Sequence, residues 1–282
     1  MTTVSGLGLS VLVCAALVAF GRRHWARATK MKSALLDSAR QPATAGAAKV
    51  YGVRDLEGLP APVQRYFRAV LKDGQPLIAT ATFELAGTID LSATGDSRWK
   101  SFTSWQRAVV HRPGFLWNGR VVMFPGVAAH VHDSYILGVG TLHAAMLGLF
   151  TVAEVQGGGE IARGELMRYL AETVWYPTAL LPGGGVHWAA VDDRSATATL
   201  EDGSIGVTLL FGFDDAGLIT TIHADARGVV AGKEMLMLPW DCTVSDYRRR
   251  HGMMVPSRGI VGKGGQPYFV GDITSLEYEF SK

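Results

Sequence analysis

Apolar and polar residues alternate along most of the chain after Pro76, which is the pattern of half-buried β-strands. Turn-forming stretches such as Glu201-Asp202-Gly203 separate the alternating segments. The pattern predicts strands over residues 77–85, 87–91, 99–110, 115–124, 128–137, 141–155, 187–191, 196–200, 206–213, 218–227, 235–247, 254–261 and 272–280. Many strands with few helices between them predict a mainly β domain of the α+β class. We expect one large curved antiparallel sheet, or half-barrel.

Two segments of the same region carry apolar residues at helical spacing instead, residues 55–71 and 163–174. In the second, Leu166, Leu170 and Val174 form an apolar stripe, and charged side chains occupy the opposite face. We expect this stripe to face the concave side of the sheet, which makes the segment a covering helix whose charged face meets solvent.

An apolar run without any charge occupies residues 4–20. As a helix it is about 25 Å long, near the short limit for crossing a hydrocarbon core of about 30 Å. Bases follow it closely, namely Arg22, Arg23, Arg27, Lys30 and Lys32, and no acid lies among the first 32 residues. The run therefore predicts a single N-terminal transmembrane helix in the cell membrane. The positive-inside rule places the rest of the chain in the cytoplasm, with the periplasm as the alternative.

These patterns divide the chain into three parts. Residues 1–40 form the predicted anchor and its basic collar, residues 41–54 a linker that contains Pro42 and Gly46, and residues 55–282 a single curved-sheet domain.

Composition narrows the class of protein further. Of the 282 residues, 48% are hydrophobic and 18% are charged, which excludes disorder for most of the chain. Apart from the five collar bases, the chain has 22 Lys and Arg residues and 25 Asp and Glu residues, so no basic surface for nucleic acid is expected. The two cysteines, Cys14 and Cys242, have no metal-ligand spacing, and no phosphate loop or dinucleotide fingerprint occurs. The sequence thus predicts no metal and no cofactor.

The candidates for catalysis are His132, Asp133 and Asp241. His132 lies two residues after His130, so both imidazoles share one face of a strand, and a carboxylate beside such a ring suits acid–base chemistry. The other interpretation is a solvated strand face next to a turn aspartate. For binding an apolar ligand, the candidates are Leu166, Leu170, Trp175 and Trp240, for which ordinary core packing is the alternative.

Several motifs resemble a bacterial family known only as a domain of unknown function. They are LPAPVQRYFRAVL, GELMRYLAETVWYPTALLP, the hairpin VDDRSATATLEDG, the PW that precedes SDYR, the PSRG step and the closing DITSLEYEF. The resemblance covers about residues 55–280. It implies a curved half-barrel similar in shape to proteins that carry lipoproteins across the periplasm, and it implies no activity.

Together these observations favour a membrane-anchored domain that binds an apolar or lipid-like molecule. Two alternatives fit the same pattern. One is an enzyme on a lipophilic substrate that uses His132 with Asp133 or Asp241, and the other is a non-catalytic scaffold of a membrane complex.

Overall fold

The computed structural model describes residues 2–39, 50–92, 96–231 and 234–281. Within them, a 13-stranded antiparallel sheet dominates the fold. Its strands are β1 (Ile78–Asp90), β2 (Trp99–Val109), β3 (Gly114–Phe124), β4 (Val127–Ile136), β5 (Val139–Met146), β6 (Phe150–Gly157), β7 (Val186–Asp192), β8 (Ser195–Asp202), β9 (Ile205–Phe213), β10 (Ile219–Ala231), β11 (Glu234–Ser245), β14 (Arg258–Lys263) and β15 (Gln266–Phe280). A small ribbon pairs β12 (Arg248–Arg250) with β13 (Met253–Val255). The α-helices are α1 (Thr2–Ala39), α2 (Ala61–Val70) and α3 (Gly159–Glu172), and the 3₁₀ turns are Val53–Leu56, Thr173–Trp175, Pro177–Leu180 and Pro182–Gly184.

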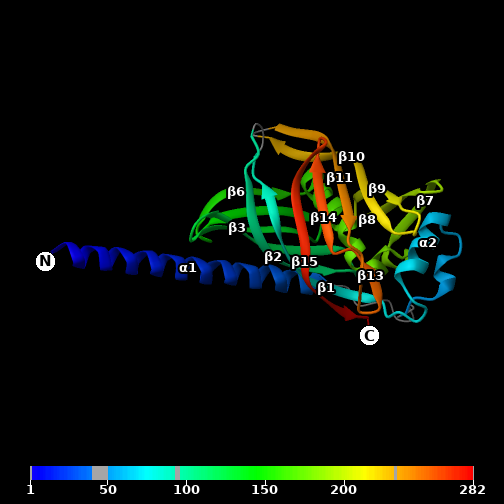
Figure 1. Cartoon of the computed structure of the whole chain (residues 1–282), viewed down its shortest axis with the longest axis horizontal. Helices are drawn as coiled ribbons and strands as arrows, with labels where there is room; N and C mark the ends of the chain where they lie inside the picture. Colours follow the sequence, from blue (N-terminus) through cyan, green and yellow to red (C-terminus); the bar gives the residue numbers. More distant parts are fainter. Residues whose placement is uncertain (1, 40–49, 93–95, 232–233, 282) are drawn as a thin grey trace.

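The chain builds the sheet as two meanders that meet in the middle. Strands β1 to β6 run from the centre to one edge, and β7 to β11 run from the other edge back toward the centre. Strands β14 and β15 then fill the gap between β11 and β1 (Figure 1). Helix α3 and the turns after it connect the two edges, and α3 contacts strands of both meanders, including β5 and β9. The predicted covering helix therefore lies on the concave side.

Close backbone approach lets the sheet curl at its centre. Gly87 of β1 lies opposite Gly271 of β15, and a Cβ atom at Gly87 would lie 1.9 Å from the carbonyl oxygen of Val270. A register shift at Glu84 and Leu85 adds a bulge to the same pair of strands. Glycine bends and bulges are the usual source of sheet curvature. The prediction of a mainly β, curved antiparallel half-barrel is confirmed.

Several predicted strand boundaries differ from the observed ones. Residues 141–155, predicted as one strand, form the hairpin of β5 and β6, because Leu147 and Gly148 both adopt positive φ and reverse the chain. The predicted strands 77–85 and 87–91 are in contrast one continuous strand, β1. Alternation alone does not reveal such changes, since the short turn at residues 147–149 leaves the apolar–polar pattern in place on both sides.

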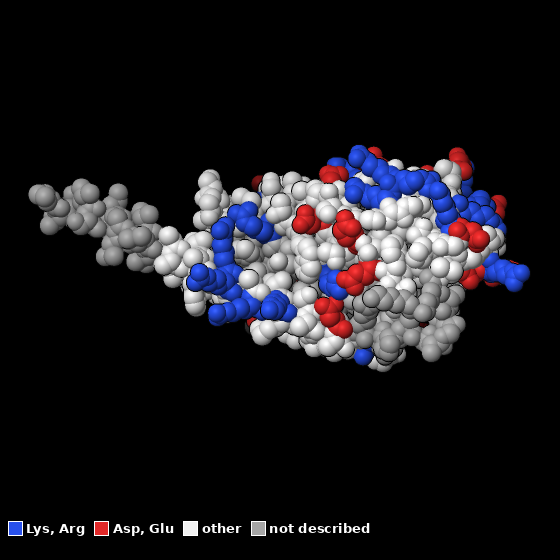
Figure 2. Space-filling view, turned by 90° about the horizontal axis from the view of Figure 1, so that it is seen from below, with Lys and Arg blue, Asp and Glu red and all other residues white. Residues whose placement is uncertain are grey.

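Helix α1 packs against the outer, convex face of the sheet through its second half. Trp25 and Leu36 are buried there, and α1 contacts β2, β3 and β4. Arg22, Arg23 and Arg27 stay exposed, and Figure 2 shows Lys and Arg gathered on this stretch. The residues predicted as a basic collar thus belong to a helix that covers the domain.

The predicted transmembrane helix over residues 4–20 is not supported. Across the described ranges, none of the helices combines the length and the apolar character that crossing a membrane requires. The run lies in the first half of α1, and the side chains of residues 1–14 lie outside the described part of the chain. Most of the predicted linker 41–54, namely residues 41–49, lies outside it as well.

Candidate functional site

A cavity of about 460 Å³ lies between α3 and the concave face of the sheet. Most of its wall is apolar and comes from many strands. The wall includes Ile89 of β1, Val121 of β3, Val131 of β4, Val229 of β10, Val244 of β11, Val261 of β14 and Phe269 of β15. Leu91 and Leu142 also line the cavity and are each 37% exposed, so it reaches the surface beside them.

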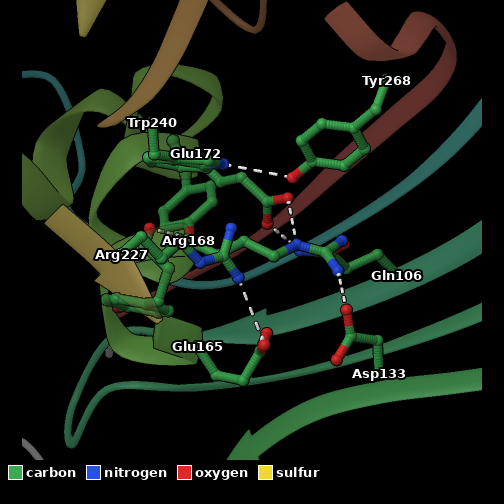
Figure 3. Close-up of polar contacts among 10 residues, drawn as sticks. Gln106, Asp133, Glu165, Arg168, Glu172, Arg227, Trp240 and Tyr268 are labelled. Carbon is green, nitrogen blue, oxygen red and sulfur yellow. Dashed lines mark hydrogen bonds and ion pairs between the residues drawn. The ribbon is translucent and has the colours of Figure 1, made fainter. Parts of the chain in front are cut away.

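Charged residues line the same cavity on the side of α3. Arg168 donates hydrogen bonds to Asp133 at 2.6 Å, to Glu172 at 2.8 Å and to the amide oxygen of Gln106 at 3.0 Å (Figure 3). Its guanidinium also lies 4.8 Å from the ring centroid of Phe115, within cation–π range. Three acceptors and an aromatic face hold Arg168 in one orientation, so this residue is a structural clamp between α3 and the sheet.

A second arginine, Arg227, enters the cavity from β10. Its Nη2 donates to Glu165 at 3.2 Å, and its guanidinium lies 4.7 Å from the ring centroid of Trp240. Both side chains of the Arg227–Glu165 pair are 12% exposed. Trp240 in turn donates through Nε1 to the hydroxyl oxygen of Tyr268 at 3.1 Å (Figure 3). The arginine is thus positioned by an aromatic ring and one carboxylate.

The carboxyl group of Glu165 has a pKa shifted from its ordinary value. Burial, followed by the neighbouring Asp133 carboxylate, raises the pKa of Glu165, and this outweighs the opposing effects of Arg227 and Arg168. One oxygen of each carboxyl group, Glu165 Oε2 and Asp133 Oδ1, is buried without a hydrogen-bond partner among the described residues. Both observations favour a Glu165 that keeps a proton under conditions in which an exposed glutamate would lose it.

The comparisons with known proteins identify a family. The sequence profile of DUF6920, a family of unknown function, matches residues 57–278. The chain belongs to the DUF6920 family. The resemblance drawn from its motifs is thereby confirmed for the domain-of-unknown-function family and its extent. No protein of curated function matches the chain.

Solved structures with similar folds cover most of this DUF6920 chain at low identity. A domain described as outer membrane lipoprotein-sorting, from Vibrio parahaemolyticus, covers 81% of this chain and 92% of its own, with 9% identity and a TM-score of 0.40. A DUF1329 family protein from Desulfovibrio piger covers 72% and 86%, with 11% identity and a TM-score of 0.37. A LolA superfamily protein from Nitrosomonas europaea covers 77% and 92%, with 11% identity and a TM-score of 0.32.

The residues considered for binding fall into two groups. Trp175 and Trp240 line the cavity of this DUF6920 domain. Leu166 and Leu170 are completely buried in the main hydrophobic core and do not line it.

The residues considered for catalysis are not brought together. His132 and Asp133 are consecutive in β4, so their side chains point to opposite faces of the sheet. Asp133 faces the cavity, whereas His132 lies under Trp25 on the convex face. Asp241 is also directed away from the cavity and accepts a hydrogen bond from His223 Nδ1 at 2.7 Å.

Sequence patterns did not reveal the charged lining. The pattern predicts that the charged face of residues 163–174 meets solvent, but the side chains of Glu165 and Arg168 are only 12% and 16% exposed because α3 lies inside the half-barrel. The sequence pattern does not place Arg227 at the cavity either. A register shift between Ala224 and Arg227 interrupts the alternation of β10, so its inward direction cannot be counted from neighbouring residues. One signal in the sequence is the spacing of four residues between Arg168 and Glu172, which places the two side chains side by side on a helix.

The described residues contain no group of three or more His, Cys, Asp or Glu side chains placed to hold a metal ion.

Proposed function

We propose that this domain binds an apolar or lipid-like molecule in the cavity between α3 and the concave face of the sheet. The observation that carries the proposal is the cavity itself, about 460 Å³ in volume and walled mainly by aliphatic and aromatic side chains. Protein interiors contain few voids larger than a water molecule, so a space of this size calls for an occupant. Its volume falls in the range of small-molecule sites, about 300–1,000 Å³.

The chemistry of the lining supports binding rather than covalent catalysis. Cys242 is the thiol on the wall, and burial raises its pKa, which keeps it protonated and a poor nucleophile. Of the three candidates for acid–base chemistry, only Asp133 lines the cavity, whereas His132 and Asp241 point away from it on the distant strands β4 and β11. A carrier or sensor of an apolar molecule needs only the cavity and its mouth.

The test is direct binding of a neutral apolar fluorophore, N-phenylnaphthylamine, to the full chain. We expect saturable binding and displacement by long-chain alcohols. Ala144 of β5 lines the cavity, so Ala144→Trp should weaken binding at least about tenfold by filling it. Ala190 on the edge strand β7 is exposed, and Ala190→Trp is the matched control that should bind as the wild type does. Absence of saturable binding, or equal binding by both variants, would contradict the proposal.

The exposed bases of α1 support a location at an anionic membrane surface. Each base near such a surface contributes about 1 kcal/mol of attraction. The full chain should co-sediment with vesicles that contain anionic lipid and not with neutral phosphatidylcholine vesicles. Reversal of Arg22, Arg23 and Arg27 to glutamate should abolish this binding, whereas Arg194→Glu on the exposed β7–β8 turn should not. Equal binding to both kinds of vesicle would remove the electrostatic argument.

A further inference from the structure

The two arginines of the cavity differ in how many acceptors they have. Arg168 donates to three side chains, Asp133, Glu172 and Gln106. Arg227 donates, among the described residues, to Glu165 alone, through one nitrogen and at the longer distance of 3.2 Å. A guanidinium has five N–H groups in a planar fork. Arg227 therefore has donors left for a ligand, in a cavity whose wall is mostly apolar.

The balance of charges around the cavity gives the sign of the ligand's charge. The charged side chains that line the cavity are Arg168, Arg227 and Lys263 against Asp133, Glu165 and Glu172. With all six ionised their charges cancel, but a proton on Glu165 leaves one positive charge in excess. Burial and the Asp133 carboxylate raise the pKa of Glu165 and so favour that protonated state. A desolvated excess charge is costly unless an opposite charge joins it.

A second donor lies beside Arg227. The hydroxyl oxygen of Tyr268 accepts the hydrogen bond from Trp240, so the hydroxyl proton of Tyr268 points to another acceptor. Tyr268 lines the cavity with Arg227 and Trp240. A forked guanidinium next to a hydroxyl donor suits an oxyanion with two or more oxygens, such as a carboxylate or a phosphate ester.

We propose that the ligand is an amphiphile with a singly charged oxyanion head, that the head binds Arg227, and that it binds best to the domain in which Glu165 is protonated. The proposal rests on the proposed function, because the cavity must first accept the apolar tail. The head acts as the counter-ion of Arg227, because a protonated Glu165 no longer supplies the opposing charge.

Titratable and charged side chains from several elements surround Glu165. Its neighbours are Asp133 on β4, Arg227 on β10, and Arg168 and Glu172 on α3. The same cavity is also lined by Cys242 on β11, Lys263 on β14 and Tyr268 on β15. Glu165 is the acid among them that is both raised in pKa and in contact with Arg227. A pH dependence that disappears with Glu165 therefore reports on this pair.

The experiment compares two ligands of equal chain length, dodecanesulfonate and dodecanol, as competitors of N-phenylnaphthylamine on the full chain. The sulfonate stays ionised throughout, so any pH dependence belongs to the protein. From about pH 9 to about pH 5 we expect dodecanesulfonate to bind about tenfold tighter, and dodecanol to bind equally at both ends. Arg227→Met should weaken the binding of dodecanesulfonate about tenfold to a hundredfold and leave the binding of dodecanol unchanged.

Two further variants keep the test decisive if Arg227→Met does not fold. Glu165→Gln, which imitates the protonated acid, should bind dodecanesulfonate tightly and without pH dependence. Arg227→Lys keeps the charge without the fork and should retain the preference for dodecanesulfonate at reduced affinity. Arg194→Met, on an exposed turn, is the matched control.

The outcomes separate the two proposals. Equal affinity for both competitors, or a Glu165→Gln variant with the pH dependence of the wild type, would overturn the oxyanion site while leaving the apolar cavity in place. Failure of N-phenylnaphthylamine to bind at all would instead overturn the proposed function.

Discussion

The indole ring of Trp25 stacks on the imidazole ring of His132, with ring centroids 4.0 Å apart and planes 16° from parallel. Trp25 lies on α1 and His132 on β4, so this contact joins the N-terminal helix to the convex face of the sheet. The hydroxyl of Thr29 donates to the carbonyl oxygen of Trp25 and lies 2.8 Å from His132 Nε2. This assigns the imidazole proton to Nε2 and leaves Nδ1 as a buried acceptor without a partner among the described residues.

Removal of this stack should loosen α1. Trp25 is 4% exposed and also donates to Asn118 at 2.9 Å, so Trp25→Ala removes both a large buried ring and a hydrogen bond. We expect a loss of about 3–5 kcal/mol in the free energy that holds α1 on the sheet. Urea denaturation and hydrogen exchange of residues 22–36 would measure it. Phe20→Ala, at a position 59% exposed on the same helix, should change neither quantity.

His132 makes stability depend on acid pH. Burial, and then the charges of Lys32, His143 and His130, lower the pKa of His132 to about 3. The unfolded chain takes up this proton near pH 6.5 and the folded chain does not, so the fold loses stability as pH falls below about 6.5. The slope from this group is at most about 1.4 kcal/mol per pH unit.

A variant isolates that slope from other groups. His132→Gln should be less sensitive to acid than the wild type between about pH 6 and about pH 4, when unfolding free energies are compared at each pH. His187→Gln, at an exposed position, should keep the wild-type slope. Identical slopes in all three proteins would show that His132 is not buried in its neutral form. Glu165 acts in the opposite direction, because a raised pKa makes the fold lose stability as pH rises.

Helix α1 also depends on a backbone contact at Gly21. A Cβ atom there would lie 2.1 Å from the carbonyl oxygen of Leu147, in the turn between β5 and β6. Gly21→Leu should therefore displace the helix and increase hydrogen exchange across residues 22–36. Ala19→Leu places the same side chain at an exposed position of α1 and should leave exchange unchanged. Equal protection in both variants would mean that α1 does not dock through Gly21.

Core and cavity positions are distinguishable on α3 and on the 3₁₀ turn that follows it. Leu170 is completely buried and does not line the cavity, so Leu170→Ala should cost about 2–5 kcal/mol of stability and leave the affinity for N-phenylnaphthylamine unchanged. Val174 lines the cavity, so Val174→Trp should weaken the binding of the fluorophore. Thermal denaturation and fluorescence titration of both variants would measure the two effects. Weaker binding by Leu170→Ala would place that leucine at the cavity after all.

Much of the architecture follows from local sequence. Alternation after Pro76 reflects side chains that point in turn to the two faces of a strand, and the apolar stripe with Leu166 and Leu170 reflects the helical period, so strands and covering helix are predictable without coordinates. The family motifs extend the same information over residues 57–278. The cavity positions of Trp175 and Trp240 are also predictable from the sequence, because aromatic side chains often line the ligand cavity of a curved sheet.

The charged lining of the cavity and the docking of α1 were decided only by tertiary structure. A helix with one charged face ordinarily turns that face to water, yet α3 connects the two edges of the sheet and lies against its concave face, so the side chains of Glu165 and Arg168 are only 12% and 16% exposed. The bulge in β10 turns Arg227 inward against the local alternation. Gly21 meets Leu147 across 126 positions of sequence. Periodicity reports which side of its own element a residue occupies, whereas burial and pairing depend on what the rest of the chain places against that side.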